Sequence, residues 1–294
     1  MGENTNRRAI MAVMVCAVLW GFWWLPVSLM EGAGLNGPWI ALAINLSSLP
    51  VAVAVAVWAG ARMSGRAVLG GIMIGLAITL YALAAAYTDF IRAVLLFYLA
   101  PAWSTLIEVI WFRRRWTRFV SLALSLSFVG ILLISRGEIE FSGLGALGDW
   151  MALGSGLSWS IGVALLFAGA RASTGGTFLV AALSGAVMAG VIGLLDGSMA
   201  HGWPSVDLGR LGASAVFACG FMGILLGGTL WGAFQLPPTV MTYLLSLEII
   251  GGVFSSAVFL DERFGWFEAG GAVCILSAVL VEVLAQRQTR ARPV

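Results

Sequence analysis

The stretch that decides the fold is LLFYLAPAWSTLIEVIWFRRRWT, from Leu95 to Thr117. Its first eighteen residues contain one charged side chain, Glu108, and three consecutive arginines follow, Arg113 to Arg115. An apolar run of about this length is what an α-helix needs to cross a bilayer, and arginines gather on the cytoplasmic side. The stretch therefore predicts a membrane-spanning helix that ends at the cytoplasmic surface.

The whole chain has the same apolar character. Its 294 residues are 60% hydrophobic and only 10% charged, whereas soluble domains are roughly 45–50% apolar and about 25% charged. So few charged side chains cannot cover a globular surface, which excludes a soluble enzyme, a nucleic-acid binder and a disordered chain. The net charge of +2, with every one of the 16 basic residues an arginine, gives no reason to expect a polyanionic partner. We expect a polytopic membrane protein surrounded by the lipid bilayer.

Ten segments are long and apolar enough to span a bilayer. All are expected to be α-helices, because a spanning backbone must satisfy its own hydrogen bonds in lipid. With the N-terminus inside, twelve of the 16 arginines lie in the cytoplasm and four lie outside, so both termini are expected in the cytoplasm. The four outside are Arg92, Arg136, Arg210 and Arg263. The approximate limits of the segments are 9–29, 38–59, 67–86, 91–112, 119–135, 147–170, 176–195, 211–233, 239–260 and 266–285.

The chain contains an internal repeat. The stretch YLLSLEIIGGVFSSAVFLDERFG, from Tyr243 to Gly265, aligns without a gap to the stretch that begins at Leu95, at an offset of 148. The two halves, residues 9–136 and 147–285, carry five spans each, so the second half is upside down relative to the first. The predicted fold is an all-α polytopic membrane protein of ten transmembrane helices, arranged as two inverted five-helix repeats. Such repeats are typical of secondary transporters, whose substrate site lies near the midplane between them.

Several short motifs lie within the two halves of the repeat. They are VLWGFWWLP at 18–26, GDWMALGSGLSWS at 148–160, YLLSLE at 243–248, FLDER at 259–263 and GGAVCILSAVLV at 270–281. In order and spacing they resemble the EamA-type repeat of the drug/metabolite transporter superfamily. The aromatic first span, together with FYLAPAW at 97–103, is similar to the aromatic amino-acid exporter subgroup, YddG. The resemblance implies export of aromatic amino acids, and also of flat aromatic cations, out of a bacterial cytoplasm across the inner membrane.

The chain departs from the superfamily at two places. The small multidrug exporters use a carboxylate in the middle of their first helix, whereas the first span here has only Glu31 at its outer end. Their proton exchange is therefore not implied. The family's LEP sequence in the ninth span reads Leu247-Glu248-Ile249 here, without the proline.

Glu248 is the one acidic residue predicted deep within a span. A charged side chain there costs about 2.5–3.5 kcal/mol on insertion scales, so it should face a cavity or a partner. Two roles remain open for it. It could anchor a substrate amino group or carry a proton, or it could be a hydrogen-bonded glutamate that joins two helices.

Aromatic side chains within the spans are the other candidates for a substrate site, because tryptophan and tyrosine stack on aromatic ligands and on flat cations. Trp20 and Trp159 stand out because they align, at an offset of 139, in the first and sixth spans. Pro101 interrupts the fourth span and is the candidate hinge, because proline frees a backbone carbonyl and kinks a helix. The full set of predicted substrate-binding residues is Trp20, Tyr81, Tyr98, Trp103, Trp159, Tyr243, Ser246 and Glu248.

Other functions fit the sequence less well. An anionic substrate needs a cationic side chain at mid-membrane, and no arginine is predicted there. An intramembrane serine protease needs a histidine base, and the single histidine, His201, lies between spans. Metal-ligand clusters are also missing, so we expect no enzyme, no metal and no cofactor. Export of another small neutral or zwitterionic metabolite, and a channel, remain as alternatives. A monomer is expected, since one chain supplies both halves.

Overall fold

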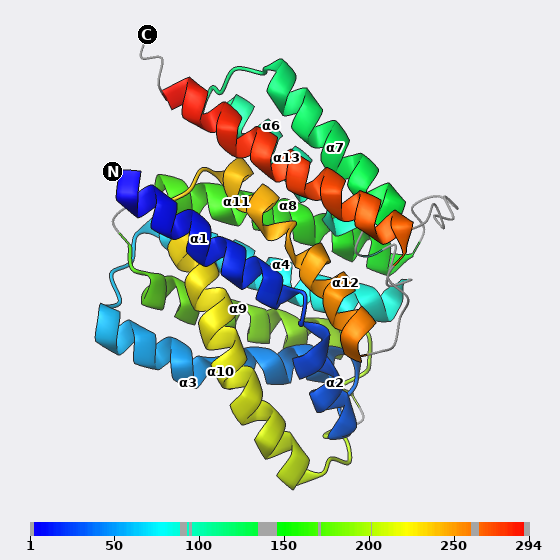
Figure 1. Ribbon diagram of the computed structural model, residues 1–294. Helices are drawn as coiled ribbons and strands as arrows, with labels where there is room; N and C mark the ends of the chain where they lie inside the picture. Colours follow the sequence, from blue (N-terminus) through cyan, green and yellow to red (C-terminus); the bar gives the residue numbers. More distant parts are fainter. Residues whose placement is uncertain are drawn as a thin grey trace.

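The structure is a computed structural model that describes residues 3–88, 93, 96–134, 146–169, 172–200, 202–259 and 265–290. Within those ranges all regular structure is helical, and the helices form one bundle (Figure 1). Arg92, Arg136, Arg263 and His201 lie outside the described residues. The helices are α1 (Glu3–Trp20), α2 (Trp24–Gly32), α3 (Gly37–Ala59), α4 (Gly65–Tyr87), α6 (Ala100–Trp111), α7 (Arg118–Ile134), α8 (Leu147–Ala168), α9 (Thr174–Leu195), α10 (Leu208–Ala233), α11 (Pro238–Leu245), α12 (Glu248–Phe259) and α13 (Trp266–Arg290).

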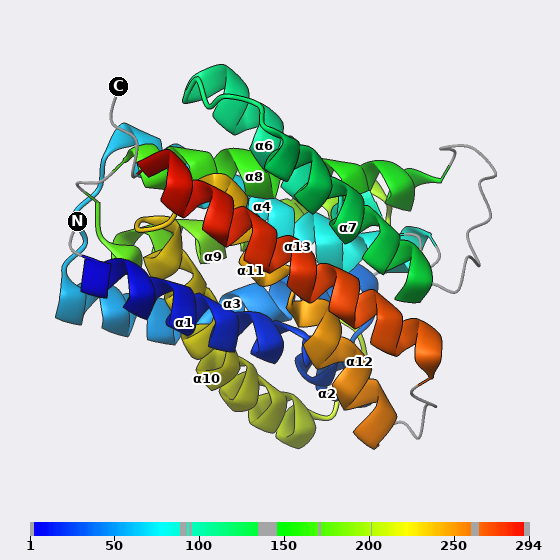
Figure 2. The ribbon, with the colours of Figure 1, turned by 45° about the horizontal axis from the view of Figure 1, so that its top comes forward.

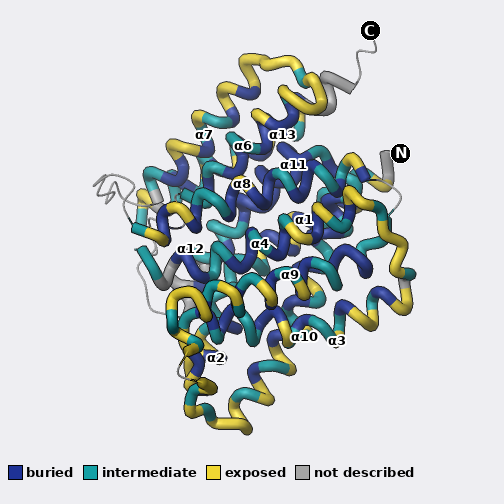
Figure 3. The backbone as a smooth tube through the Cα atoms, turned by 180° about the vertical axis from the view of Figure 1, so that it is seen from behind, coloured by how far each residue is buried: buried dark blue, intermediate teal, exposed yellow. Residues whose placement is uncertain are grey.

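The described chain has the features of a polytopic membrane protein. Six of its helical segments are long and apolar enough to cross a membrane by length and composition. Large apolar side chains stand on the outside of the bundle, such as Val57 at 80% and Trp266 at 93% exposure. Figure 3 shows the exposed residues on the outer helices and at the ends of the bundle, while the central helices are mostly buried. Lipid rather than water suits such an apolar outer surface.

Local sequence signals set several of the helix ends close to the predicted limits. The side chains of Ser64 and Ser173 accept hydrogen bonds from backbone N–H groups in the first turns of α4 and α9. Asp207 does the same at the start of α10. Such caps satisfy donors that the helix itself leaves unpaired. Gly60, with φ of +81°, follows the last residue of α3, a conformation that favours glycine.

Three of the predicted spans are interrupted rather than continuous. The first divides into α1 and α2 at residues 21–23, and the ninth divides into α11 and α12 at 246–247. In the fourth, a turn at Tyr98 and Leu99 precedes α6. α6 and α12 are both 12 residues long and both follow a two-residue turn, and their first residues are 148 positions apart.

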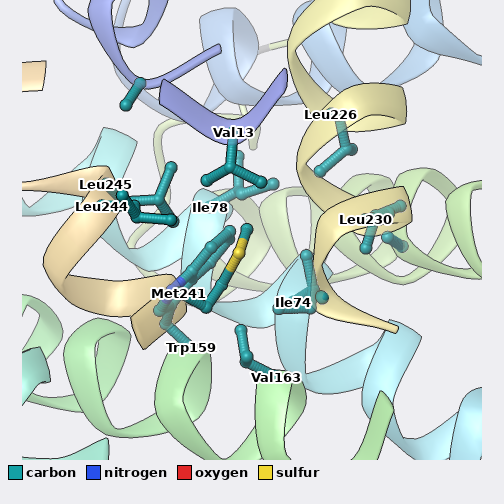
Figure 4. Close-up of a cluster of buried hydrophobic side chains, with 14 of the residues drawn as sticks. Val13, Ile74, Ile78, Trp159, Val163, Leu226, Leu230, Met241, Leu244 and Leu245 are labelled. Carbon is teal, nitrogen blue, oxygen red and sulfur yellow. The ribbon is translucent and has the colours of Figure 1, made fainter. Parts of the chain in front are cut away.

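Figures 1 and 2 show how the helices surround the centre of the bundle. α4 packs against α8 and α9, α9 packs against α3, and α7 packs against α13. α1 contacts α10, α11 and α12. The main apolar core lies where these helices meet, and Figure 4 shows part of it, with Trp159 of α8 beside Met241 of α11. The start of α1 and the end of α13 lie at the same end of the bundle (Figures 1 and 2).

Candidate functional site

A cavity lies at the centre of the bundle, next to the interrupted helices. The space between protein atoms there is about 430 Å³, counted together with the part that opens to the outside. Four of the residues predicted from the sequence line it, namely Trp20, Tyr81, Trp159 and Glu248. The complete lining is Trp20, Trp23, Ala77, Ile78, Tyr81, Phe97, Trp159, Leu245 and Glu248.

Each of the three helix interruptions contributes to the lining. Trp20 and Trp23 flank the break between α1 and α2. Phe97 comes just before the turn that precedes α6, while Leu245 ends α11 and Glu248 begins α12. Irregular backbone is tolerated at membrane depth where it lines a cavity or is buried in protein. The arrangement therefore places both the interruptions and the one charged side chain of the lining around a single space.

The break between α1 and α2 touches the start of α12. A Cβ atom added to Gly21 would lie 2.2 Å from the backbone N of Gly252 and 2.5 Å from the carbonyl O of Glu248. A Cβ atom on Gly251 would lie 2.2 Å from the carbonyl O of Val18. Only glycine allows two backbones to approach so closely. This contact holds Glu248 directly against the first predicted span.

A second crossing joins α8 to the turn before α6. The hydroxyl of Ser160 donates a hydrogen bond to the carbonyl O of Ala100 at 3.1 Å. A Cβ atom on Gly156 would lie 2.8 Å from the carbonyl O of Phe97. Ala100 and Glu248 begin α6 and α12, so each crossing helix contacts the first residue of a half-helix.

Glu248 is bound by a tyrosine from the opposite half of the chain. The Tyr98 hydroxyl donates to Oε1 of Glu248 at 2.5 Å, a short bond of the charge-assisted kind. Tyr98 itself is only 7% exposed. Its ring contacts Phe97 edge-on, with centroids 5.6 Å apart, and Phe97 contacts Tyr81 at 4.6 Å. The carboxylate is therefore held at the end of a row of three aromatic rings.

The tryptophans of the cavity differ in how they are held. The indole N–H of Trp20 donates to Thr229 Oγ1 of α10 at 3.1 Å, and its ring lies 5.3 Å from that of Trp23. Trp159 is 5% exposed and belongs to the central core cluster (Figure 4). Trp20 thus has its polar atom turned to α10, and its ring is what it offers to a ligand.

Five residues predicted for the site or hinge lie outside the cavity lining, and one of them, Tyr98, is bound to Glu248 as described above. Tyr243 is 1% exposed in the core, and the Ser246 hydroxyl donates to the carbonyl O of Thr242 within its own helix turn. Trp103 lies on α6, and its buried indole N–H has no hydrogen-bond partner among the described residues. Pro101 lies in the first turn of α6 rather than inside a helix, so it removes no helical hydrogen bond. Its role as a hinge stays a prediction.

Trp23, Phe97 and Leu245 line the cavity without having been predicted to do so. Trp23 belongs to the VLWGFWWLP motif, so the aromatic content of this motif was a signal for it. Its spacing from Trp20 was a second signal, because side chains three residues apart are neighbours on a helix. The two rings lie 5.3 Å apart in the structure and line the same space.

A buried charge network lies away from the cavity. Glu108 of α6 accepts from the backbone N of Thr239 at 2.7 Å and from Arg114 Nη1 at 3.0 Å. Arg114 Nη2 lies 2.7 Å from Oε1 of Glu282 on α13, whose side chain is 0% exposed. We name Glu108, Arg114 and Glu282 the charge network. The sequence indicated Arg114 as part of a cytoplasmic arginine run. Its partner Glu108 lies six residues earlier, whereas its partner Glu282 is far away along the chain.

Comparison with known proteins supports the fold and goes no further. No family profile matches the sequence, and no curated protein matches it. The fold matches 29 chains of solved structures. One is a crystal structure of a protein that shares 17% sequence identity with this chain, at a TM-score of 0.73, over 96% of this chain and 99% of the other. At that identity the likeness shows a shared fold, and function must be argued from the site.

Proposed function

We propose that this chain is a secondary transporter that exports aromatic amino acids, or related small aromatic solutes, across the bacterial inner membrane by alternating access. The observation that carries the proposal is the cavity, where five aromatic side chains and one carboxylate meet at interrupted helices. Aromatic walls bind flat ligands, and a carboxylate can receive an ammonium group. Transporters place such sites near the midplane, at discontinuous helices.

The proposal includes an inverted repeat, with halves at residues 9–136 and 147–285. The equal lengths of α6 and α12, and the offset of 148 between their starts, support it. The two crossings support it as well. At the offset of 139, Ser160 corresponds to Gly21, and each lies against the carbonyl O of the residue that begins a half-helix, Ala100 or Glu248. Equivalent contacts at equivalent positions are what an inverted repeat would produce.

The proposed topology has ten spans, with both termini in the cytoplasm. The start of α1 and the end of α13 lie at the same end of the bundle (Figures 1 and 2), as an even number of crossings requires. The arginine asymmetry of the sequence favours the cytoplasm for that end. One chain supplies both halves, so the proposed transporter is a monomer of the EamA type within the drug/metabolite transporter superfamily.

Alternating access follows from the way the cavity is built. Its walls come from both proposed halves, Trp20, Trp23, Tyr81 and Phe97 from the first and Trp159, Leu245 and Glu248 from the second. Rocking one half against the other would open the cavity to one side of the membrane at a time. The hydrogen bond between Tyr98 and Glu248 crosses between the halves, so it reports directly on their relative position.

Counterflow in proteoliposomes tests the proposal. Vesicles that contain unlabelled phenylalanine should transiently accumulate labelled phenylalanine from outside, with saturation, and tryptophan should compete. Alanine is the control solute and should neither exchange nor compete. Flux without saturation or counterflow would instead indicate a channel. Exchange of other metabolites but of no aromatic amino acid would overturn the assigned substrate and favour another small neutral or zwitterionic solute.

Two variants link the exchange to the cavity. Glu248→Gln removes the charge of the lining, and we expect it to lower aromatic exchange by about tenfold or more, the value of a hydrogen bond to a charged group. Glu31→Gln removes the same charge from an exposed position at the end of α2 and should exchange at the wild-type rate. Wild-type exchange by Glu248→Gln would leave Glu248 with a purely structural role.

A further inference from the structure

The residues that line the cavity carry one negative charge and no positive charge. Glu248 is the only charged residue among the nine that line it, and the rest are apolar or aromatic. Within the part of the chain that the structure describes, the one hydrogen bond to its carboxylate comes from Tyr98, on Oε1. The second carboxylate oxygen is therefore available to a ligand that enters the space.

Among the residues that line the cavity, no positive side chain offsets this charge. The sequence contains no lysine. Every arginine whose side chain the structure describes is exposed, except Arg114. Arg114 is held by Glu108 and Glu282 in the charge network. A ligand carboxylate in the cavity would thus lie near Glu248 without a cationic side chain among the lining residues to receive it, and a charge buried without a partner is costly.

The aromatic side chains of the lining favour a cation, as Glu248 does. The faces of Trp20, Trp23, Tyr81, Phe97 and Trp159 carry the negative part of each ring's quadrupole, which attracts a cation and repels an anion. Carboxylate and rings together therefore favour a ligand that is aromatic and carries a net positive charge.

We infer that the preferred occupant of the cavity is a net-cationic arylalkylamine, and that this class binds more tightly than the corresponding zwitterionic amino acid. The inference rests on the proposed function and sharpens it. The ammonium group binds Glu248 and the aromatic ring stacks against the tryptophans. The carboxylate of an amino acid lowers the affinity, because no lining residue binds it. A decarboxylated aromatic amino acid is therefore the better ligand.

Four small molecules that share a phenyl ring and a two-carbon chain test this charge preference. They are 2-phenylethylamine, phenylalanine, 3-phenylpropionate and 2-phenylethanol, and their affinities are measured by calorimetry on the full-length protein in detergent at pH 7. We expect 2-phenylethylamine to bind at least about tenfold more tightly than phenylalanine, because the carboxylate of phenylalanine would be buried near Glu248 without a cationic partner. The anion 3-phenylpropionate should bind most weakly of the four.

Variants then assign the preference to Glu248. Glu248→Gln should lose about tenfold in affinity for 2-phenylethylamine and keep its affinity for 2-phenylethanol, whose retained binding shows that the variant is folded. Glu31→Gln should leave all four affinities unchanged. Tyr98→Phe retains the carboxylate and should retain the order of the series, which keeps the test decisive if Glu248→Gln does not fold.

The outcomes separate this inference from the proposed function. Phenylalanine binding as tightly as 2-phenylethylamine, together with aromatic counterflow, would overturn the charge preference and leave the transporter proposal standing. An unchanged amine preference in a folded Glu248→Gln would overturn the role of Glu248. If none of the four molecules binds and no counterflow occurs, both the proposed function and the inference fail.

Discussion

Gly21 and Gly251 bring two backbones into contact beside Glu248. Hypothetical Cβ atoms at these positions would lie 2.2 Å from backbone atoms of the other segment. Backbone cannot move aside as a flexible side chain can, so the whole break between α1 and α2 would have to shift. At this scale, the absence of two side chains is what allows the cavity to have its present shape.

Gly21→Ala should therefore impair both stability and transport. We expect a loss of more than about 1–3 kcal/mol, the usual cost of overpacking, and a fall in aromatic counterflow. Gly227→Ala is the matched control, because a Cβ atom there meets nothing within 4 Å in α10, and alanine is the better helix former by roughly 0.5–1 kcal/mol. Thermal unfolding in detergent compares the two. Equal unfolding midpoints would refute the close contact.

Substitution of Arg114 should destabilise the protein far more than substitution of the neighbouring arginines. Arg114→Leu leaves Glu108 and Glu282 buried without their shared cation, and we expect a loss of about 3–5 kcal/mol, the cost of removing one partner from a buried ion pair. Arg115→Leu removes an exposed charge from the same run and should unfold near the wild-type temperature. Similar unfolding of both variants would contradict the charge network.

At the scale of elements, the half-helices α6 and α12 decide where the cavity lies. Both begin after a two-residue turn, and both have their first residue in contact with a crossing helix. The proline of α6 is in its first turn, where its missing N–H costs nothing. The half-helices are thus short segments that start at the cavity wall, which suits elements that move as units.

Pro101→Ala tests whether the start of α6 works as a hinge. We expect slower counterflow at unchanged ligand affinity, because alanine loosens the fixed φ of proline without altering the lining of the cavity. Pro50→Ala is the control, since Pro50 lies inside α3, a helix that contributes nothing to the lining. Exchange at the wild-type rate by Pro101→Ala would show that Pro101 is not a hinge.

At the scale of the whole molecule, the bundle presents apolar side chains outward and places its termini at one end (Figures 1 and 3). The apolar surface suits lipid, and the common end for the termini requires an even number of membrane crossings. We propose that this end faces the cytoplasm, because arginines are retained on the cytoplasmic side of a membrane.

Fusions at the two termini test this topology. Green fluorescent protein should fluoresce when fused to either end, since it matures in the cytoplasm, whereas alkaline phosphatase fused to the C-terminus should be inactive. An added fusion just before Leu208, where α10 begins, should give the opposite pattern. Active phosphatase at the C-terminus would overturn the assignment of both ends to the cytoplasm.

The sequence by itself determined the class of the protein and most of its helix limits. Segment length and apolar composition suffice for this, because the thickness of a bilayer sets how many residues a helix needs. It also singled out Trp20, Tyr81, Trp159 and Glu248, which line the cavity. These were found because an aromatic or charged residue in an apolar span is conspicuous without any knowledge of its neighbours.

Which aromatic residues face the cavity, and what each charged group binds, depend on the tertiary packing of the helices. Trp23 lines the cavity, whereas Tyr243 lies in the core, because the packing of the helices decides which side of each one faces the space. The partner of Glu248, Tyr98, lies 150 residues away, and one of the two partners of Arg114, Glu282, lies 168 residues away. Contacts between such distant segments depend on how helices cross, and the crossings depend on backbone approaches such as Gly21 on Gly252, which local composition does not encode.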